Sequence, residues 1–173
     1  MITAIIENKG NTLVTEFPVA NYRLSEQLYC IGITERIGDI PVRGDSDTKV
    51  ELLDDGKMGA AILKRLTDSD TLTGLNMACQ AVAKAAPYGY EEILGMFEPE
   101  LSERYEFYKK FEPLPPSTEL GVKGILEDTQ RYCATMDNYR RVCEAEQQED
   151  EELDEEFDEA LDEELDEEDG WEM

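Results

Sequence analysis

Carboxylates repeat near the end of this 173-residue chain with a spacing suited to electrostatic binding. Residues 153–168 read LDEE, FDEA, LDEE and LDEE, each tetrad opening with an apolar residue. On a helix these carboxylates would occur roughly every 2.2 Å of axis, against about 1.7 Å for the charges of duplex DNA. The pattern predicts a polyanion that competes with nucleic acid for cationic surfaces. The predicted partner-binding residues are Glu151, Glu152, Asp154, Glu155, Glu156, Asp158, Glu159, Asp162, Glu163, Glu164, Asp166, Glu167 and Glu168.

The net charge of −26 is concentrated in the same segment. Residues 144–173 hold 19 acidic and no basic side chains, which leaves 23 acidic against 16 basic residues elsewhere. A chain of this sign repels free nucleic acid and anionic membranes. We therefore expect a basic protein as the partner, with no direct binding to nucleic acid or membrane.

Two other interpretations of the acidic segment stay open. Long blocks of one charge are usually solvated and disordered, and this one could serve solubility alone. Carboxylates also bind calcium, but the segment lacks the loop glycine and the D-x-D-x-D-G order of an EF-hand, so any binding would be diffuse and weak. In the interpretation that favours a partner, the apolar positions Leu153, Phe157, Leu161 and Leu165 form a drifting stripe that packs on the body or on the partner.

The remaining composition argues against catalysis. Histidine is absent, which removes the usual general base and the commonest neutral metal ligand. The four cysteines form no CxxC pair and are expected to be reduced, and no glycine pattern matches a nucleotide-binding loop. We expect a non-enzymatic protein without cofactor or metal. With no apolar run long enough for a membrane helix or signal peptide, a cytoplasmic location is the expectation.

The elements that must position the acidic segment follow from periodicity. Residues 2–7 and 12–19 alternate around the turn Asn8-Lys9-Gly10-Asn11, which predicts a β-hairpin. Leu24, Leu28 and Ile31 have helical spacing, and Gly32 provides a helix stop.

Further along the chain, residues 37–42 and 49–53 are extended candidates, and residues 59–66 have a helical period. Asp68-Ser69-Asp70 predicts a loop and N-cap before a helix with Leu72, Leu75, Cys79 and Val82. An aromatic helical stretch from Tyr90 to Phe111 suits core packing or an interface, and a last helix is expected over Thr118–Glu146.

These elements predict an α+β fold, with an N-terminal β-hairpin and a small antiparallel sheet packed with helices. The expected organisation is an α+β domain over residues 1–86, a helical extension packed on it over 87–145, and an acidic tail over 146–173. We expect this tail to be disordered, or helical when bound.

A resemblance adds to this interpretation. It is carried by Met1 to Asn8, Phe17-Pro18-Val19, Ile31-Gly32-Ile33 and Asp70-Thr71-Leu72 followed by Asn76. Over about the first 80 residues the chain resembles small acidic antirestriction and anti-CRISPR proteins of phages and conjugative elements of Gram-positive bacteria. Members of the antirestriction class present carboxylates where a nuclease expects DNA phosphates. Their charge is usually spread over folded surfaces, whereas here it lies in the last thirty residues.

The resemblance implies an inhibitor of a bacterial host's restriction or CRISPR nuclease, acting partly by nucleic-acid mimicry on a basic groove. The alternative is an acidic, chaperone-like accessory protein that shields a basic partner. The two hypotheses differ in one result, since only the inhibitor would abolish the partner's nuclease activity.

Overall fold

The computed structural model describes residues 1–34, 40–101, 105–112, 115, 117 and 119–168, with backbone alone for residue 101 and for 149–168. The fold is α+β, as the sequence predicts. Its elements, in chain order, are β1 (Ile2–Asn8), β2 (Asn11–Phe17), α1 (Asn21–Cys30), β3 (Thr48–Asp54), α2 (Lys57–Arg65), α3 (Leu72–Ala85), α4 (Glu91–Phe97), η2 (Pro99–Leu101), α5 (Tyr105–Tyr108), η3 (Lys109–Phe111) and α6 (Gly121–Glu168).

The three strands form one antiparallel sheet in the order β2-β1-β3. In the centre, Ile5 of β1 lies opposite Val14 of β2 on one side and Glu51 of β3 on the other. The predicted hairpin is confirmed. Its two turn residues, Lys9 and Gly10, have φ angles of 51° and 85°, the positive values that a tight turn matching the strand twist requires.

Helix α1 ends where the sequence predicts. Gly32 has a φ of 82°, its N–H donates to the carbonyl of Tyr29 at 3.0 Å, and the N–H of Ile33 donates to the carbonyl of Leu28 at 3.0 Å. This pair of bonds is a Schellman motif, which satisfies carbonyls left without partners at a helix end. The glycine permits the left-handed conformation that the motif needs.

One face of the sheet is buried. Ile2, Ala4 and Ile6 are fully buried and share a core with residues from every α-helix except α5, including Ile62 and Ile125. Alternate positions of β1 lie on the other face, where Glu7 is exposed. The two-residue period of β1 therefore separates core from solvent.

The extended candidate at residues 37–42 is not a strand in its described part. Residues 35–39 lie outside the described residues, and Pro41 forms only an isolated bridge with Thr71. The Val42 N–H donates to the Asp70 carbonyl, and the Leu72 N–H donates to the Ile40 carbonyl, each at 2.9 Å. The segment thus pairs briefly with the turn before α3, while the second candidate, residues 49–53, lies within β3.

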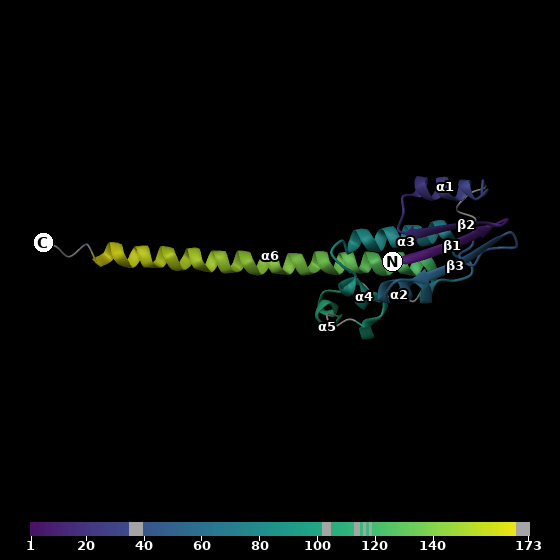
Figure 1. Ribbon diagram of the computed structural model, residues 1–173. Helices are drawn as coiled ribbons and strands as arrows, with labels where there is room; N and C mark the ends of the chain where they lie inside the picture. The colour runs from purple at the N-terminus through teal and green to yellow at the C-terminus, as the bar shows by residue number, and fades with distance from the viewer. Residues whose placement is uncertain (35–39, 102–104, 113–114, 116, 118, 169–173) are drawn as a thin grey trace.

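Helix α6 dominates the shape of the molecule. The predicted last helix was to end at Glu146, but α6 runs from Gly121 to Glu168, 48 residues and about 72 Å at 1.5 Å per residue. Its first half lies against the body, and its second half leaves the body and extends away from the sheet (Figure 1). The acidic tetrads thus continue a helix whose first part, residues 121–139, packs in the core. We call this first part the root of α6.

Candidate functional site

The root of α6 is held by side chains at helical spacing. Ile125, Thr129, Tyr132 and Thr135 are buried, and the elements beside them include α3 and α4. Spacings of three and four residues place these positions on one face of the helix. Burial of this face fixes the axis along which the rest of α6 projects.

The N-terminus of α6 is capped from another part of the chain. Asp70 Oδ1 accepts a hydrogen bond from the Val122 N–H at 3.0 Å, and its Oδ2 accepts one from the Thr67 N–H at 2.7 Å. The sequence predicted Asp68 to Asp70 as the N-cap of α3, and this is wrong. The cap of α3 is Thr71, whose Oγ1 accepts from the Gly74 N–H at 3.2 Å.

A buried charge network joins α6 to α2 and α4. Asp128 and Arg131 of α6 are each 3 % exposed at the side chain. Asp128 pairs with Arg65 of α2, and the Arg131 Nη2 donates to the Met96 carbonyl of α4 at 3.1 Å. The Arg131 Nη1 lies 3.3 Å from Glu112 Oε1, and its Nε lies 3.6 Å from Asp128 Oδ1. Because buried charges are tolerated only when paired, this network allows few other positions for the root.

Aromatic rings pack the body against α6 near Tyr139. The Tyr139 ring centroid lies 5.5 Å from that of Phe107, 6.3 Å from that of Tyr108 and 5.3 Å from that of Phe111. These tilted and edge-on contacts are the favoured geometry for ring pairs. The aromatic stretch therefore packs α5 and η3 on the root, in agreement with the core-packing interpretation.

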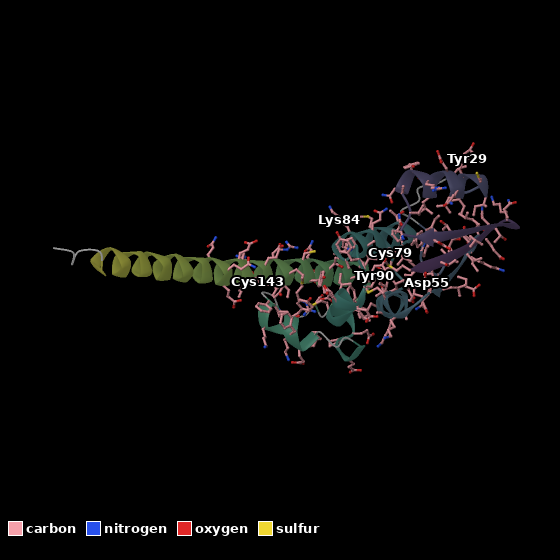
Figure 2. All side chains as sticks on the ribbon, turned by 60° about the vertical axis from the view of Figure 1, so that its left-hand side comes forward. Tyr29, Asp55, Cys79, Lys84, Tyr90 and Cys143 are labelled. Atoms are coloured by element: carbon pink, nitrogen blue, oxygen red, sulfur yellow. The ribbon has the colours of Figure 1, made fainter. Side chains whose placement is uncertain are left out.

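The surroundings of α6 change beyond Tyr139. From Arg140 to Gln148 every side chain is exposed except the half-buried Cys143. Figure 2 shows Cys143 where the helix leaves the body, and Tyr29 of α1 on the far side of the body. The part of α6 from residue 140 to 168 therefore leaves the body, and we call it the projection. It is available to a partner.

All thirteen predicted partner-binding carboxylates lie in this projection. Residues 151–168 are part of α6, so the structure brings them together along one helix axis. The stretch 144–168 carries 17 acidic residues and no basic one, roughly one carboxylate per 2 Å of axis. The candidate site is therefore a rod of negative charge.

Cations gather where the rod begins. Lys109 and Lys110 of η3 and Arg140 and Arg141 of α6 are all exposed. The Arg140 Nη1 pairs with Asp137 Oδ1 at 3.0 Å, while Lys109 Nζ lies 4.0 Å from Glu106. The charge therefore changes sign between the body end of α6 and its projection.

Two grooves flank this point, and sequence reasoning missed both. The larger, about 1020 Å³, is lined from α3, α4 and α6 by residues that include Lys84, Tyr88, Cys133 and Arg140. The smaller, about 520 Å³, is lined by residues that include Lys110, Phe111, Arg141 and Val142. Their lining residues are far apart in the chain, so no local pattern could have indicated them.

The larger groove suits binding better than nucleophilic chemistry. Burial raises the pKa of the Cys133 thiol, and the nearby Asp137 carboxylate raises it further, so the thiol stays protonated near neutral pH. Burial also raises the pKa of Tyr132, with a further contribution from Glu92. Among the described residues no group of three or more His, Cys, Asp or Glu side chains could hold a metal ion.

No protein family, curated protein or solved structure matches this chain. In the part of the chain that the structure describes, no helix combines the length and apolar character needed to cross a bilayer. The features that bear on function are therefore the projection, its root and the two grooves.

Proposed function

We propose that this protein is a non-enzymatic inhibitor of a bacterial defence nuclease, of the restriction or CRISPR type, in the host cytoplasm. It binds the basic nucleic-acid groove of its target, partly by nucleic-acid mimicry. The observation that carries the proposal is the position of 17 acidic residues, without a basic one, on the half of α6 that projects from the body. The resemblance to antirestriction and anti-CRISPR proteins that we expect over the first 80 residues is part of this proposal and implies the same class of target.

The negative charge of the rod requires a positively charged partner and makes binding depend on salt. A cationic groove that accepts one phosphate charge per about 1.7 Å of DNA axis meets a similar charge density on the rod. Binding releases counterions from both surfaces, so affinity should fall steeply as salt rises. Charge complementarity also accelerates encounter.

Specificity requires more than charge, because a polyanion alone would bind any basic protein. The body supplies shaped surfaces beside the rod, namely the groove next to Arg140 and the groove next to Arg141. The ion pair of Asp128 with Arg65 and the hydrogen bond from Arg131 to the Met96 carbonyl hold the root of the rod against the body beside these grooves. Fixed geometry of this kind favours one target among many basic proteins.

The test is protection of DNA from a panel of restriction and CRISPR nucleases at low salt. The wild-type protein should block cleavage by at least one nuclease, and inhibition should weaken when salt rises from about 50 to about 200 mM. A variant with the thirteen tail carboxylates replaced by Asn and Gln should lose inhibition.

The matched control exchanges Asp for Glu and Glu for Asp at the same thirteen positions, which keeps the charge. This control should inhibit like the wild type. The proposal is falsified if the wild-type protein protects DNA from no nuclease of the panel at low salt.

The second candidate is an acidic accessory protein that shields a basic partner. The separation of the rod from the body favours it, since such a rod can cover cations without the body occupying the partner's active site (Figure 1). It predicts that the partner becomes more soluble while its nuclease activity is retained. Solubility and cleavage measured on the same mixture separate the two functions.

A further inference from the structure

The projecting half of α6 carries an apolar pattern besides its charge. Leu153, Phe157, Leu161 and Leu165 follow one another at four-residue spacing within the helix. Each step of four residues turns by about 400°, so the four positions drift by only about 40° per step. They share one side of the helix.

That side is the one by which α6 packs on the body. Position 161 is 36 residues, or about ten turns, from the buried Ile125, so the two have nearly the same direction around the axis. Position 157 falls in line with Tyr139 in the same way. All four apolar positions lie within about 80° of the direction of Ile125. The face that belongs to the core at the root therefore continues along the projection, where Asp154, Glu164 and Glu168 lie in the same sector as the apolar positions.

The continuation of this face has no neighbour in the described chain. At the root, Ile125 is fully buried, Tyr132 is 5 % exposed and Tyr139 contacts three rings. Beyond the body no other described element lies beside α6 (Figure 1). An amphipathic helix derives most of its stability from packing of its apolar face, and like charges four residues apart oppose the helix. The projection thus lacks the packing that stabilises the root.

Charge selects the occupant of this face. A second copy would place two stretches of 17 carboxylates side by side with no cation between them, which opposes pairing. A partner with cations on both sides of an apolar track would remove that repulsion and cover the stripe. Glu146 and Asp150 lie on the same face before the stripe begins, so the partner must carry cations there as well.

We propose that the projecting half of α6 docks onto a basic amphipathic helix of its partner, which packs an apolar track against positions 153, 157, 161 and 165 with lysines or arginines on both sides. The stripe spans about 18 Å, so the partner helix needs at least about three turns. This inference rests on the proposed function, and it adds which element of the target binds the projection. Recognition is then helix against helix, and the carboxylates supply the flanking ion pairs.

The probe is a helical peptide of about 18 residues with leucines at positions that form one face and lysines elsewhere. A second peptide has the same lysine count but alanines in place of the leucines. Wild-type protein should bind the leucine peptide about tenfold or more tightly than the alanine peptide, because only the first covers the stripe. Equal affinities measured by fluorescence anisotropy overturn the inference.

A variant with Gln at positions 153, 157, 161 and 165 keeps every charge and should lose the preference between the peptides. The matched control places Gln at four exposed apolar positions of the body, Val14, Tyr22, Tyr29 and Leu53, and should keep it. Thermal melting of the body verifies that both variants are folded. A Gln variant that retains the wild-type preference also overturns the inference.

The two proposals fail separately. If the Gln variant inhibits a nuclease like the wild type while the charge-neutral variant does not, the proposed docking of a partner helix is wrong. The proposal of nucleic-acid mimicry then stands. If the peptides bind as expected but no nuclease is inhibited, the proposed function fails and the docking surface stands. If sedimentation shows that the wild-type protein is a dimer and the Gln variant is a monomer, the apolar face binds a second copy, and the inference is overturned.

Discussion

The two halves of α6 share one helix and one apolar face, yet they lie in opposite surroundings. In the first half, Ile125 and Tyr132 are buried and Asp128 is paired with two arginines. In the second half the same face continues through Leu161 beside carboxylates, with no described element packed against it (Figure 1). A helical pattern thus specifies a face, while the neighbours of that face decide whether it is core or contact surface.

The largest expected effect is at the root. Asp128→Asn removes the negative charge between Arg65 and Arg131 and should lower the free energy of unfolding by about 3 to 5 kcal/mol. Denaturant titration measures the loss. The control Asp137→Asn removes an exposed pair with Arg140 and should change stability by less than about 1 kcal/mol. Equal effects of the two variants would mean that the buried network does not hold the root.

Apolar truncation should separate the two halves in the same way. Ile125→Ala leaves a cavity at a fully buried position and should cost about 2 to 5 kcal/mol. Leu161→Ala, ten turns further along the same face, should change the free energy of unfolding by no more than about 0.5 kcal/mol. A large loss for Leu161→Ala in the isolated protein would show that the projection packs on the body or on a second copy.

The cap of α6 should give a smaller effect. Asp70→Ala removes the acceptor of the Val122 N–H and should cost about 0.5 to 2 kcal/mol. The control Asp68→Ala breaks only an exposed pair with Arg43 and should be close to neutral. Both variants are compared by urea denaturation. A neutral Asp70→Ala would contradict the role of this carboxylate in starting α6.

A pH series tests how tightly the body is packed. Burial raises the pKa of the Cys79 thiol to about 12, from an ordinary value of 9.0. The unfolded chain then loses this proton first, so the thiol's stabilising contribution is complete below pH 9 and is lost as pH rises toward 12. The melting temperature of wild type should therefore fall more between pH 8 and 11 than that of Cys79→Ala. Parallel curves would contradict burial of this thiol.

Removal of the projection should have the smallest effect. A chain that ends at Gln147 keeps every described body contact of α6, so the melting temperature of the body should change by no more than about 2 °C. Circular dichroism should nevertheless lose much of its helical signal. A large drop in melting temperature would mean that the projection stabilises the body, and the comparison between the two halves would fail.

Local patterns predicted much of the fold. The hairpin, the end of α1 at Gly32 and strand β3 follow from alternation and turn chemistry within short segments. Such features depend on interactions between residues that are near in sequence, so the sequence alone can indicate them. The acidic character of the projection is of the same kind, because charge is a property of composition.

Other features required distant segments to meet. Asp70 was expected to cap α3, but folding places it beside Val122, more than fifty residues away. The partners of Asp128 come from α2 and from its own helix, and nothing in the sequence indicates which arginine will be near. The two grooves likewise exist only where α3, α4, η3 and α6 come together.

The α+β fold, the concentration of charge in the last thirty residues and the apolar residue at the start of each tetrad follow from the order of the amino acids. That the acidic segment continues a helix rooted in the core and projects from the body follows only from how distant segments pack. Helical periodicity and charge are local properties. Burial depends on which neighbours the rest of the fold supplies.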